Sequence, residues 1–172
     1  MEQPHPSVGQ LPSYAREAAL KGFWIRLVAA ILDSIILFVM ALIISFALAV
    51  IAVTLLGEEA GIATFLLTLL SFGLALLLYK PLMEASEYQG TIGKIALSMK
   101  VVDKHGRRIT MAKSFIRTIV YIIEHAIPFG FLAFVIIAFT DENQGLHDMA
   151  ADTYVISKYW QGPVPLQDNF GA

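Results

Sequence analysis

The feature that most constrains the fold is a run of 23 residues, 34–56, without a single charged side chain. As an α-helix this run is about 34 Å long, enough to cross a hydrocarbon core of about 30 Å. A second uncharged run of 20 residues, 60–79, follows after only Gly57, Glu58 and Glu59. Because so short a connection makes the two helices antiparallel, the sequence predicts a membrane-spanning helical hairpin.

The composition supports a bilayer rather than water as the surroundings of these runs. Hydrophobic residues make up 57% of the chain and charged residues 15%, against roughly 45–50% and about 25% in soluble domains. The formal charge of -2 argues against a nucleic-acid partner. With no cysteine and no catalytic triad, zinc-ligand set or dinucleotide-binding glycines at usable spacing, we expect no enzyme activity, no metal site and no cofactor.

A third apolar block, at about 116–140, carries Glu124, Pro128 and Gly130 inside it. One interpretation is a third crossing, beside spans at about 27–56 and 60–79. The other is a break at 128–130 that turns the chain back as a re-entrant pair, each half too short to cross. The two interpretations place the C-terminal residues on opposite sides of the membrane.

Basic residues orient the hairpin, because short loops rich in lysine and arginine stay in the cytoplasm. They precede the first run and fill the loop 80–115, whereas the turn at 57–59 has none. We therefore expect an integral protein, of a bacterial inner membrane, with a cytoplasmic N-terminus and loop. Acidic residues dominate after 140, and this charge alone places the C-terminus outside. Residues 1–19 and 158–172 are expected to be disordered or flexible.

The loop 80–115 has structure of its own. Residues 91–99 fit a short interfacial helix, and residues 100–103 and 108–110 fit a hairpin about Gly106. A two-stranded hairpin is marginal, and the strand-like run 153–157 is a suitable third strand. That pairing needs a cytoplasmic C-terminal side, against the charge count. The predicted fold is an all-α integral membrane protein of a hairpin and a third, proline-broken segment, with a small cytoplasmic β element.

Over residues 20–157 the chain resembles the RDD family of small membrane proteins. The matching residues are Gly22 to Arg26, Asp33, Gly90 to Lys94, Val101 to Asp103 with Gly106, Ser114 to Arg117, Leu146 to Asp148, Ala151 and Thr153. The resemblance implies the motif residues Arg26, Asp33 and Asp148, and a role in transport, with cation/proton antiport proposed for some members. Asp152 stands where the family usually has glycine, which puts the turn before the last strand in question.

Two of the apolar blocks share a spacing of charges. Arg26 precedes Asp33 by seven residues, and Arg117 precedes Glu124 by seven, which places each pair on one helix face. We hypothesise that the four line one site for a proton and a small cation, since two close carboxylates share a proton readily. The alternative is that Arg26 pairs with Glu124 and Arg117 with Asp33, which only pins helices together. Asp148 reaches Arg26 only if the C-terminal side is cytoplasmic. The alternative role of Asp148 is to cap a short amphipathic helix that starts near Leu146.

Three hydrophobic segments cannot enclose a pathway alone, so transport predicts a homo-oligomer. The alternative function is a non-transporting scaffold or assembly protein of the membrane. Basic loop residues are candidates for contact with anionic lipid headgroups: Lys100, Lys104, Arg107 and Arg108.

Overall fold

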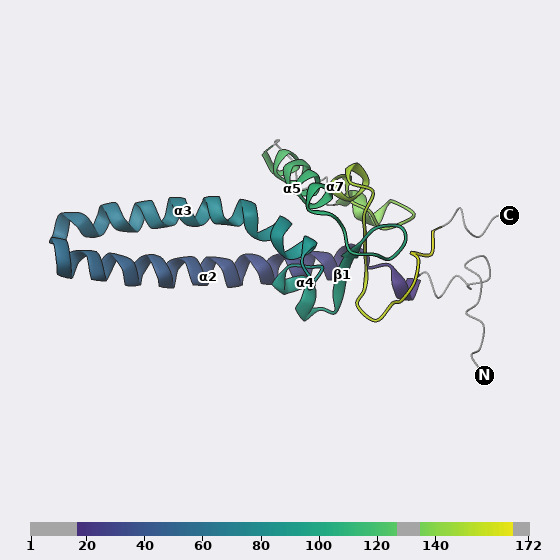
Figure 1. The fold of residues 1–172 in the computed structure, drawn as a ribbon, viewed down its shortest axis with the longest axis horizontal. Coiled ribbons are helices and arrows are strands. Elements are labelled where there is room, and N and C mark those ends of the chain that lie inside the picture. The colour runs from purple at the N-terminus through teal and green to yellow at the C-terminus, as the bar shows by residue number, and fades with distance from the viewer. Residues whose placement is uncertain (1–16, 127–134, 167–172) are drawn as a thin grey trace.

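Two long helices dominate the molecule. The computed structural model describes residues 17–126 and 135–166, in which α2 (Phe23–Leu56) and α3 (Glu58–Ala85) form an antiparallel hairpin (Figure 1). Gly57 turns the chain at φ +97°, and its N–H donates to the carbonyl oxygen of Val53. A positive φ is open to glycine at little cost, so Gly57 permits the tight connection that the sequence predicts.

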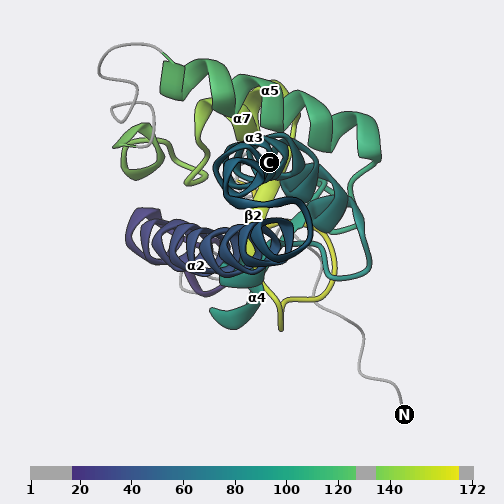
Figure 2. The same ribbon diagram turned by 90° about the vertical axis from the view of Figure 1, so that its left-hand side faces the viewer.

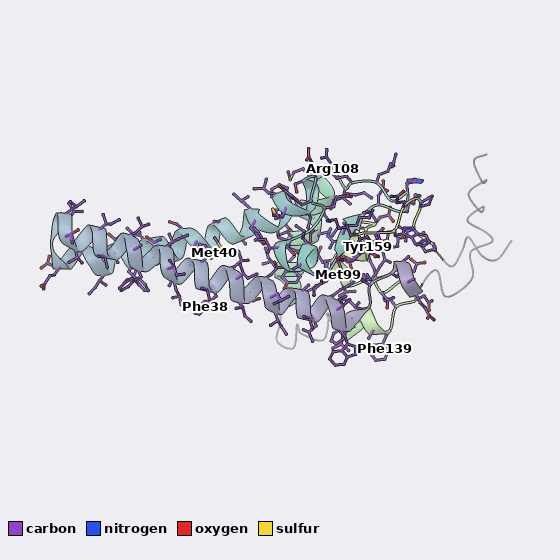
Figure 3. The ribbon with its side chains drawn as sticks, turned by 90° about the horizontal axis from the view of Figure 1, so that it is seen from below. Phe38, Met40, Met99, Arg108, Phe139 and Tyr159 are labelled. Atoms are coloured by element: carbon purple, nitrogen blue, oxygen red, sulfur yellow. The ribbon has the colours of Figure 1, made fainter. Side chains whose placement is uncertain are left out.

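The hairpin presents apolar side chains outward along its whole length (Figure 3). Phe38, Phe46 and Leu66 are each more than half exposed. Where the helices touch, the residues are small: a Cβ at Gly61 would lie 2.3 Å from a Val53 methyl carbon. An exposed apolar surface of this extent would be unstable in water, and it suits helices that pack through small residues in lipid.

The helices are longer than a bilayer requires. With 34 and 28 residues they measure about 51 and about 42 Å at about 1.5 Å per residue, whereas about 20 residues cross the hydrocarbon core. Counted from the turn at Gly57, that core ends near Leu37 on α2 and near Tyr79 on α3. The first turns of α2 and the last turns of α3 therefore lie at the level of the lipid headgroups or beyond it, outside the hydrocarbon core.

The other elements gather at the end where α2 begins and α3 ends, and we call them the base (Figure 1). In Figure 2, which looks along the hairpin, α5 lies against α3 and α4 lies on the side of α2. The base comprises α4 (Ile92–Ala96), β1 (Met99–Val102), α5 (Met111–Ala126), the 3-10 turn η2 (Ile136–Ala138), α7 (Leu146–Ala150) and β2 (Tyr154–Ser157).

The sheet of the base joins distant parts of the chain. β1 and β2 are antiparallel, with Val101 opposite Val155, and both valines are buried in the core beneath Met99 and Ala29. The predicted pairing of 100–103 with 153–157 is confirmed. The charge-based prediction that the C-terminal side lies opposite the loop 80–115 is wrong, because β-sheet hydrogen bonding holds β2 beside that loop.

Residues near both predicted flexible ends contact the sheet of the base. Leu20, the first residue of the predicted domain, is buried and bridges to Ile156. Val164 is fully buried, and its N–H donates to the carbonyl oxygen of Lys104. Val164 and Trp160 thus pack on the core around β2, and the flexibility of the tail from 158 stays a prediction.

Two other predicted elements differ from what is observed. Of the interfacial helix expected at 91–99, only α4 forms, and it is five residues long. It packs on α2 instead of lying free at the membrane surface. Residues 108–110 contribute only an isolated bridge between Arg108 and Val102. Within the described residues, two helices are long and apolar enough to span a membrane, α2 and α3. The predicted third span includes α5, but its break at 128–130 lies outside the described residues.

Candidate functional site

An ion-pair network lies where the base meets the hairpin, with Asp148 at its centre. Arg26 Nη1 on α2 lies 2.5 Å from Asp148 Oδ2, and Arg117 Nη1 on α5 pairs with Asp148 Oδ1. The N–H of Gly145 donates to Oδ2 over 3.0 Å, so Asp148 also caps α7, as the sequence predicts. Because Asp148 and Arg117 are fully buried, each charge depends on the others for compensation.

Glu84, in the last turn of α3, extends this network. Its Oε2 accepts from Arg117 Nε over 2.9 Å, and its Oε1 lies 2.5 Å from Lys94 Nζ on α4. Glu84 is fully buried. The chain of contacts Arg26, Asp148, Arg117, Glu84, Lys94 therefore links α2, α7, α5, α3 and α4 through charge-assisted hydrogen bonds.

Asp33 lies on α2, where α4 packs on the hairpin, and accepts hydrogen bonds instead of forming an ion pair. Its Oδ1 accepts the N–H of Gly93 at 2.7 Å and the hydroxyl of Tyr79 at 3.2 Å. Its Oδ2 accepts the hydroxyl of Thr91 at 2.5 Å. A Cβ at Gly93 would lie 2.2 Å from the carbonyl oxygen of Ala29, so glycine at 93 lets α4 approach α2 closely enough for Asp33 to cap it.

Glu124 contacts a histidine that the sequence does not single out as its partner. Glu124 Oε2 lies 3.0 Å from His147 Nδ1, whose ring also stacks edge-on against Tyr121. The second oxygen, Oε1, is buried and has no hydrogen-bond partner among the described residues. His147 Nε2 lies 3.5 Å from Asp148 Oδ1. Glu124 and His147 thus form a buried acid–imidazole pair, and His147 joins Glu124 to Asp148.

On α7, burial and neighbouring charges act in opposite senses on the pKa of His147 and on that of Asp148. Burial lowers the pKa of His147, more than neighbouring Asp148 and Glu124 raise it, so the imidazole is neutral at pH 7. Burial alone would raise the pKa of Asp148, but Arg117, His147 and Arg26 together hold it well below 3.8. Asp148 is therefore a permanent carboxylate, whereas His147 is free to exchange its proton.

A cleft of about 730 Å³ opens beside these groups. Its inner arm runs between α2 and α3, along Phe38, Ala41, Leu69 and Gly73. Its outer end, at the level of the lipid headgroups, is lined by charged and polar side chains: Arg26, Asp33, Tyr79, Lys80, Lys94, Arg117 and His147. The cleft is thus apolar where it faces the hydrocarbon and charged where it faces the base.

Lys80 differs from the other cations of the cleft. Its Nζ lies 3.5 Å from the centre of the Tyr121 ring, and within the described residues it forms no ion pair. We use the name charged cluster for these eight residues: Arg26, Lys80, Lys94, Arg117, Asp33, Glu84, Glu124 and Asp148. With all of them ionised and His147 neutral, the four basic and four acidic side chains sum to zero.

The four residues of the predicted ion site are close together only in part. Arg26, Asp33 and Arg117 line one cleft, and Glu124 reaches it through His147. The alternative pairing of Arg26 with Glu124 and Arg117 with Asp33 is wrong, because both arginines bind Asp148. Of the family motif, Arg26 and Asp148 form an ion pair, whereas Asp33 caps α4.

Two of the four basic residues predicted to contact lipid headgroups have side-chain contacts within the protein. Lys100 Nζ donates to the carbonyl oxygen of Trp160 over 2.8 Å, and burial lowers its pKa. Arg107 is exposed and forms an ion pair with Asp103 at 2.9 Å. Lys104 and Arg108 are exposed, so their contact with lipid stays a prediction.

Glu84, Lys80 and Lys94 are cleft and network residues that the sequence pattern does not single out. The signal was present, because Lys80 and Glu84 are four residues apart just after the second apolar run, a spacing that brings side chains together on a helix. Asp152, which replaces a glycine of the family pattern, has φ +49°. The turn before β2 therefore forms in spite of the substitution, since aspartate tolerates this conformation better than most residues.

Known proteins resemble this chain over most of its length. YxaI of Bacillus subtilis, described as an uncharacterized protein, is 36% identical over 149 residues, which cover 80% of this chain and 97% of YxaI. YckC of the same organism, also described as uncharacterized, is 32% identical over 137 residues, covering 78% of this chain and 82% of YckC. YteJ of B. subtilis, described as an uncharacterized membrane protein, is 29% identical over 140 residues, covering 80% and 81%.

No solved structure matches the chain. The family model that does match is that of the RDD family, over residues 20–152, which begins before α2 and ends in the turn before β2. It includes Arg26, Asp33 and Asp148, the three motif residues of the sequence analysis. The chain is a membrane protein with a helical hairpin and a small two-stranded sheet, and it belongs to the RDD family.

Proposed function

We propose that this protein is a small membrane transporter, not an enzyme, that exchanges a monovalent cation for a proton. The observation that carries the proposal is the buried Glu124 Oε1, which has no hydrogen-bond partner in the described part of the chain, beside a neutral His147 that lines the cleft. An unpaired carboxylate oxygen is costly to bury. A proton and a cation would compete for it, and that competition is the elementary step of exchange.

Asp33 is the second acidic group of the proposed pathway. It lines the same cleft as His147, although three hydrogen bonds already stabilise its carboxylate. The cation would pass between Asp33 and the Glu124–His147 pair at the cytoplasmic end of the hairpin. A single hairpin cannot surround such a path, so we propose a homo-oligomer in a bacterial inner membrane, with the N-terminus and the loop 80–115 in the cytoplasm.

A scaffold function is the second candidate, and the pairing of the other carboxylates favours it. Glu84 and Asp148 are each bound by two basic side chains from different elements. Such a network holds the base on the hairpin whether or not anything moves through the cleft. A protein that only assembles other membrane proteins needs this rigidity, but it does not need an unpaired oxygen on Glu124.

Flux measurements separate the two candidates. We expect Glu124→Gln to reduce proton-coupled uptake of Na⁺, Li⁺ or K⁺ into proteoliposomes at least tenfold, because an amide cannot bind the proton. Asp33→Asn is expected to reduce it as well. The control is Glu59→Gln, at the exposed hairpin turn, which should leave uptake unchanged.

Thermal unfolding in detergent completes the test. If Glu124→Gln and Asp33→Asn fold with normal melting temperatures and normal flux, exchange is excluded. Wild-type protein without flux, whose melting temperature none of the three cations shifts, would favour the scaffold. A cation-specific shift that disappears in Asp33→Asn would support exchange.

A further inference from the structure

Three cationic donors at the charged end of the cleft have unused hydrogen-bonding capacity. Arg26 Nη2 and Arg117 Nη2 are buried and have no hydrogen-bond partner among the described residues, although both side chains line the cleft. Lys80 Nζ lies against the Tyr121 ring and forms no ion pair in the same part of the chain. Guanidinium and ammonium groups without acceptors are matched by phosphate oxygens.

The depth of these donors indicates where the phosphate comes from. Lys80 directly follows Tyr79, where the hydrocarbon core ends on α3, and Arg26 lies in the first turn of α2. Lys80 is therefore at the level of lipid phosphates, and Arg26 lines the same cleft farther from the hydrocarbon core. From there the cleft continues between α2 and α3 along Phe38, Leu69 and Gly73, at the depth of the acyl chains. A Cβ at Gly73 would meet no atom of the described residues within 4 Å, so this arm has free width.

From this arrangement we infer that the cleft binds one anionic phospholipid, with its phosphate on Lys80, Arg26 and Arg117 and an acyl chain between α2 and α3. The apolar arm and the cationic end together match an amphiphile, whereas free phosphate would use only the outer end. The lipid also changes the charge of the site. The charged cluster sums to zero, and a phosphodiester makes it negative by one, which favours entry of one proton or one cation at Glu124.

The inference goes beyond the proposed exchange and is tested by binding alone. Full-length protein in a neutral detergent is titrated with phosphatidylglycerol and with phosphatidylcholine of the same chain length, and bound lipid is counted by native mass spectrometry. We expect phosphatidylglycerol to bind at least tenfold more tightly. Equal affinity for the two lipids would overturn the inference, because it would mean that the cationic donors take no part.

Two variants locate the site. Lys80→Met should weaken phosphatidylglycerol binding at least tenfold, whereas its control Lys158→Met, at an exposed lysine, should not change it. Gly73→Leu fills the apolar arm and should weaken binding of both lipids. Leucine favours helix over glycine, so Gly73→Leu should still fold, and an unchanged melting temperature verifies this. If both Lys80→Met and Gly73→Leu bound phosphatidylglycerol with wild-type affinity, this cleft would be excluded as the lipid site.

Inorganic phosphate and glycerol phosphate distinguish the possible sources of the anion. Neither should displace phosphatidylglycerol at millimolar concentration, because neither fills the apolar arm. Displacement of phosphatidylglycerol by inorganic phosphate at micromolar concentration would mean that the site binds a free anion, and it would overturn the inference. These experiments measure lipid binding and not flux. A failure of the lipid inference can therefore be told apart from a failure of the proposed exchange.

Discussion

At the scale of single residues, Asp148 has the largest effect on stability. Within the described residues it is the only acidic partner of Arg26 and one of two acidic partners of Arg117. Removing one member of a buried ion pair leaves an uncompensated charge, which typically costs about 3–5 kcal/mol. An exposed pair contributes about 0–1 kcal/mol. Burial, rather than the number of ion pairs, therefore decides how much an aspartate contributes to the free energy of unfolding.

We therefore predict that Asp148→Asn destabilises the protein by about 3–5 kcal/mol, measured by thermal or denaturant unfolding in detergent. The matched control is Asp152→Asn. Asp152 is 55% exposed, pairs with Lys113 at 3.4 Å and has φ +49°, which asparagine tolerates. A change below about 1 kcal/mol is expected there. Equal losses in both variants would contradict the assignment of Asp148 as a buried, compensated charge.

The depressed pKa of Asp148 also predicts a pH dependence. In the unfolded chain this carboxyl titrates near 3.8, and in the folded protein well below that value. Its contribution to stability is then complete above about pH 4 and is lost as the pH falls through the lower, folded pKa. The wild type should lose stability on acidification below pH 4 more steeply than Asp148→Asn. Parallel curves would contradict this linkage.

At the scale of elements, the position of α4 depends on one close approach. Gly93 lies against the backbone of Ala29, and its N–H binds Asp33. We predict that Gly93→Ala displaces α4, because its Cβ would lie 2.2 Å from the carbonyl oxygen of Ala29. Faster hydrogen exchange in residues 90–97 and a lower melting temperature are the expected results.

Gly73→Ala is the control for this substitution, because its Cβ meets no atom within 4 Å in the part of the chain that the structure describes. It replaces glycine inside a helix and should raise stability by up to about 1 kcal/mol. If Gly93→Ala behaved like Gly73→Ala, the contact between α4 and α2 would not be tight.

At the scale of the whole molecule, the sheet determines the topology. β1 and β2 are hydrogen-bonded to each other, so the residues that flank them lie on one side of the membrane, with the hairpin turn on the other. The chain has no cysteine, which makes single-cysteine labelling unambiguous. We predict that Arg108→Cys and Tyr159→Cys react with an impermeant maleimide from the same side of intact cells or vesicles, and Glu59→Cys from the opposite side.

Both Arg108 and Tyr159 lie in the base, as Figure 3 shows, and both are exposed. Labelling of Tyr159→Cys together with Glu59→Cys would mean that the sheet does not form in the membrane. The same result would separate Asp148 from Arg26 and remove the ion pair on which the site depends.

The sequence by itself determines the hairpin, because length and the absence of charge are local properties of 34–56 and 60–79, and a bilayer requires nothing more. It also indicates β1, β2 and the capping role of Asp148. The tertiary structure alone decides the partners of each charge. Arg26 and Asp148 are 122 residues apart, and β-sheet pairing, not helical periodicity, brings them together. The seven-residue spacing of Arg26 to Asp33 and of Arg117 to Glu124 fixes helix faces but says nothing of which helices meet.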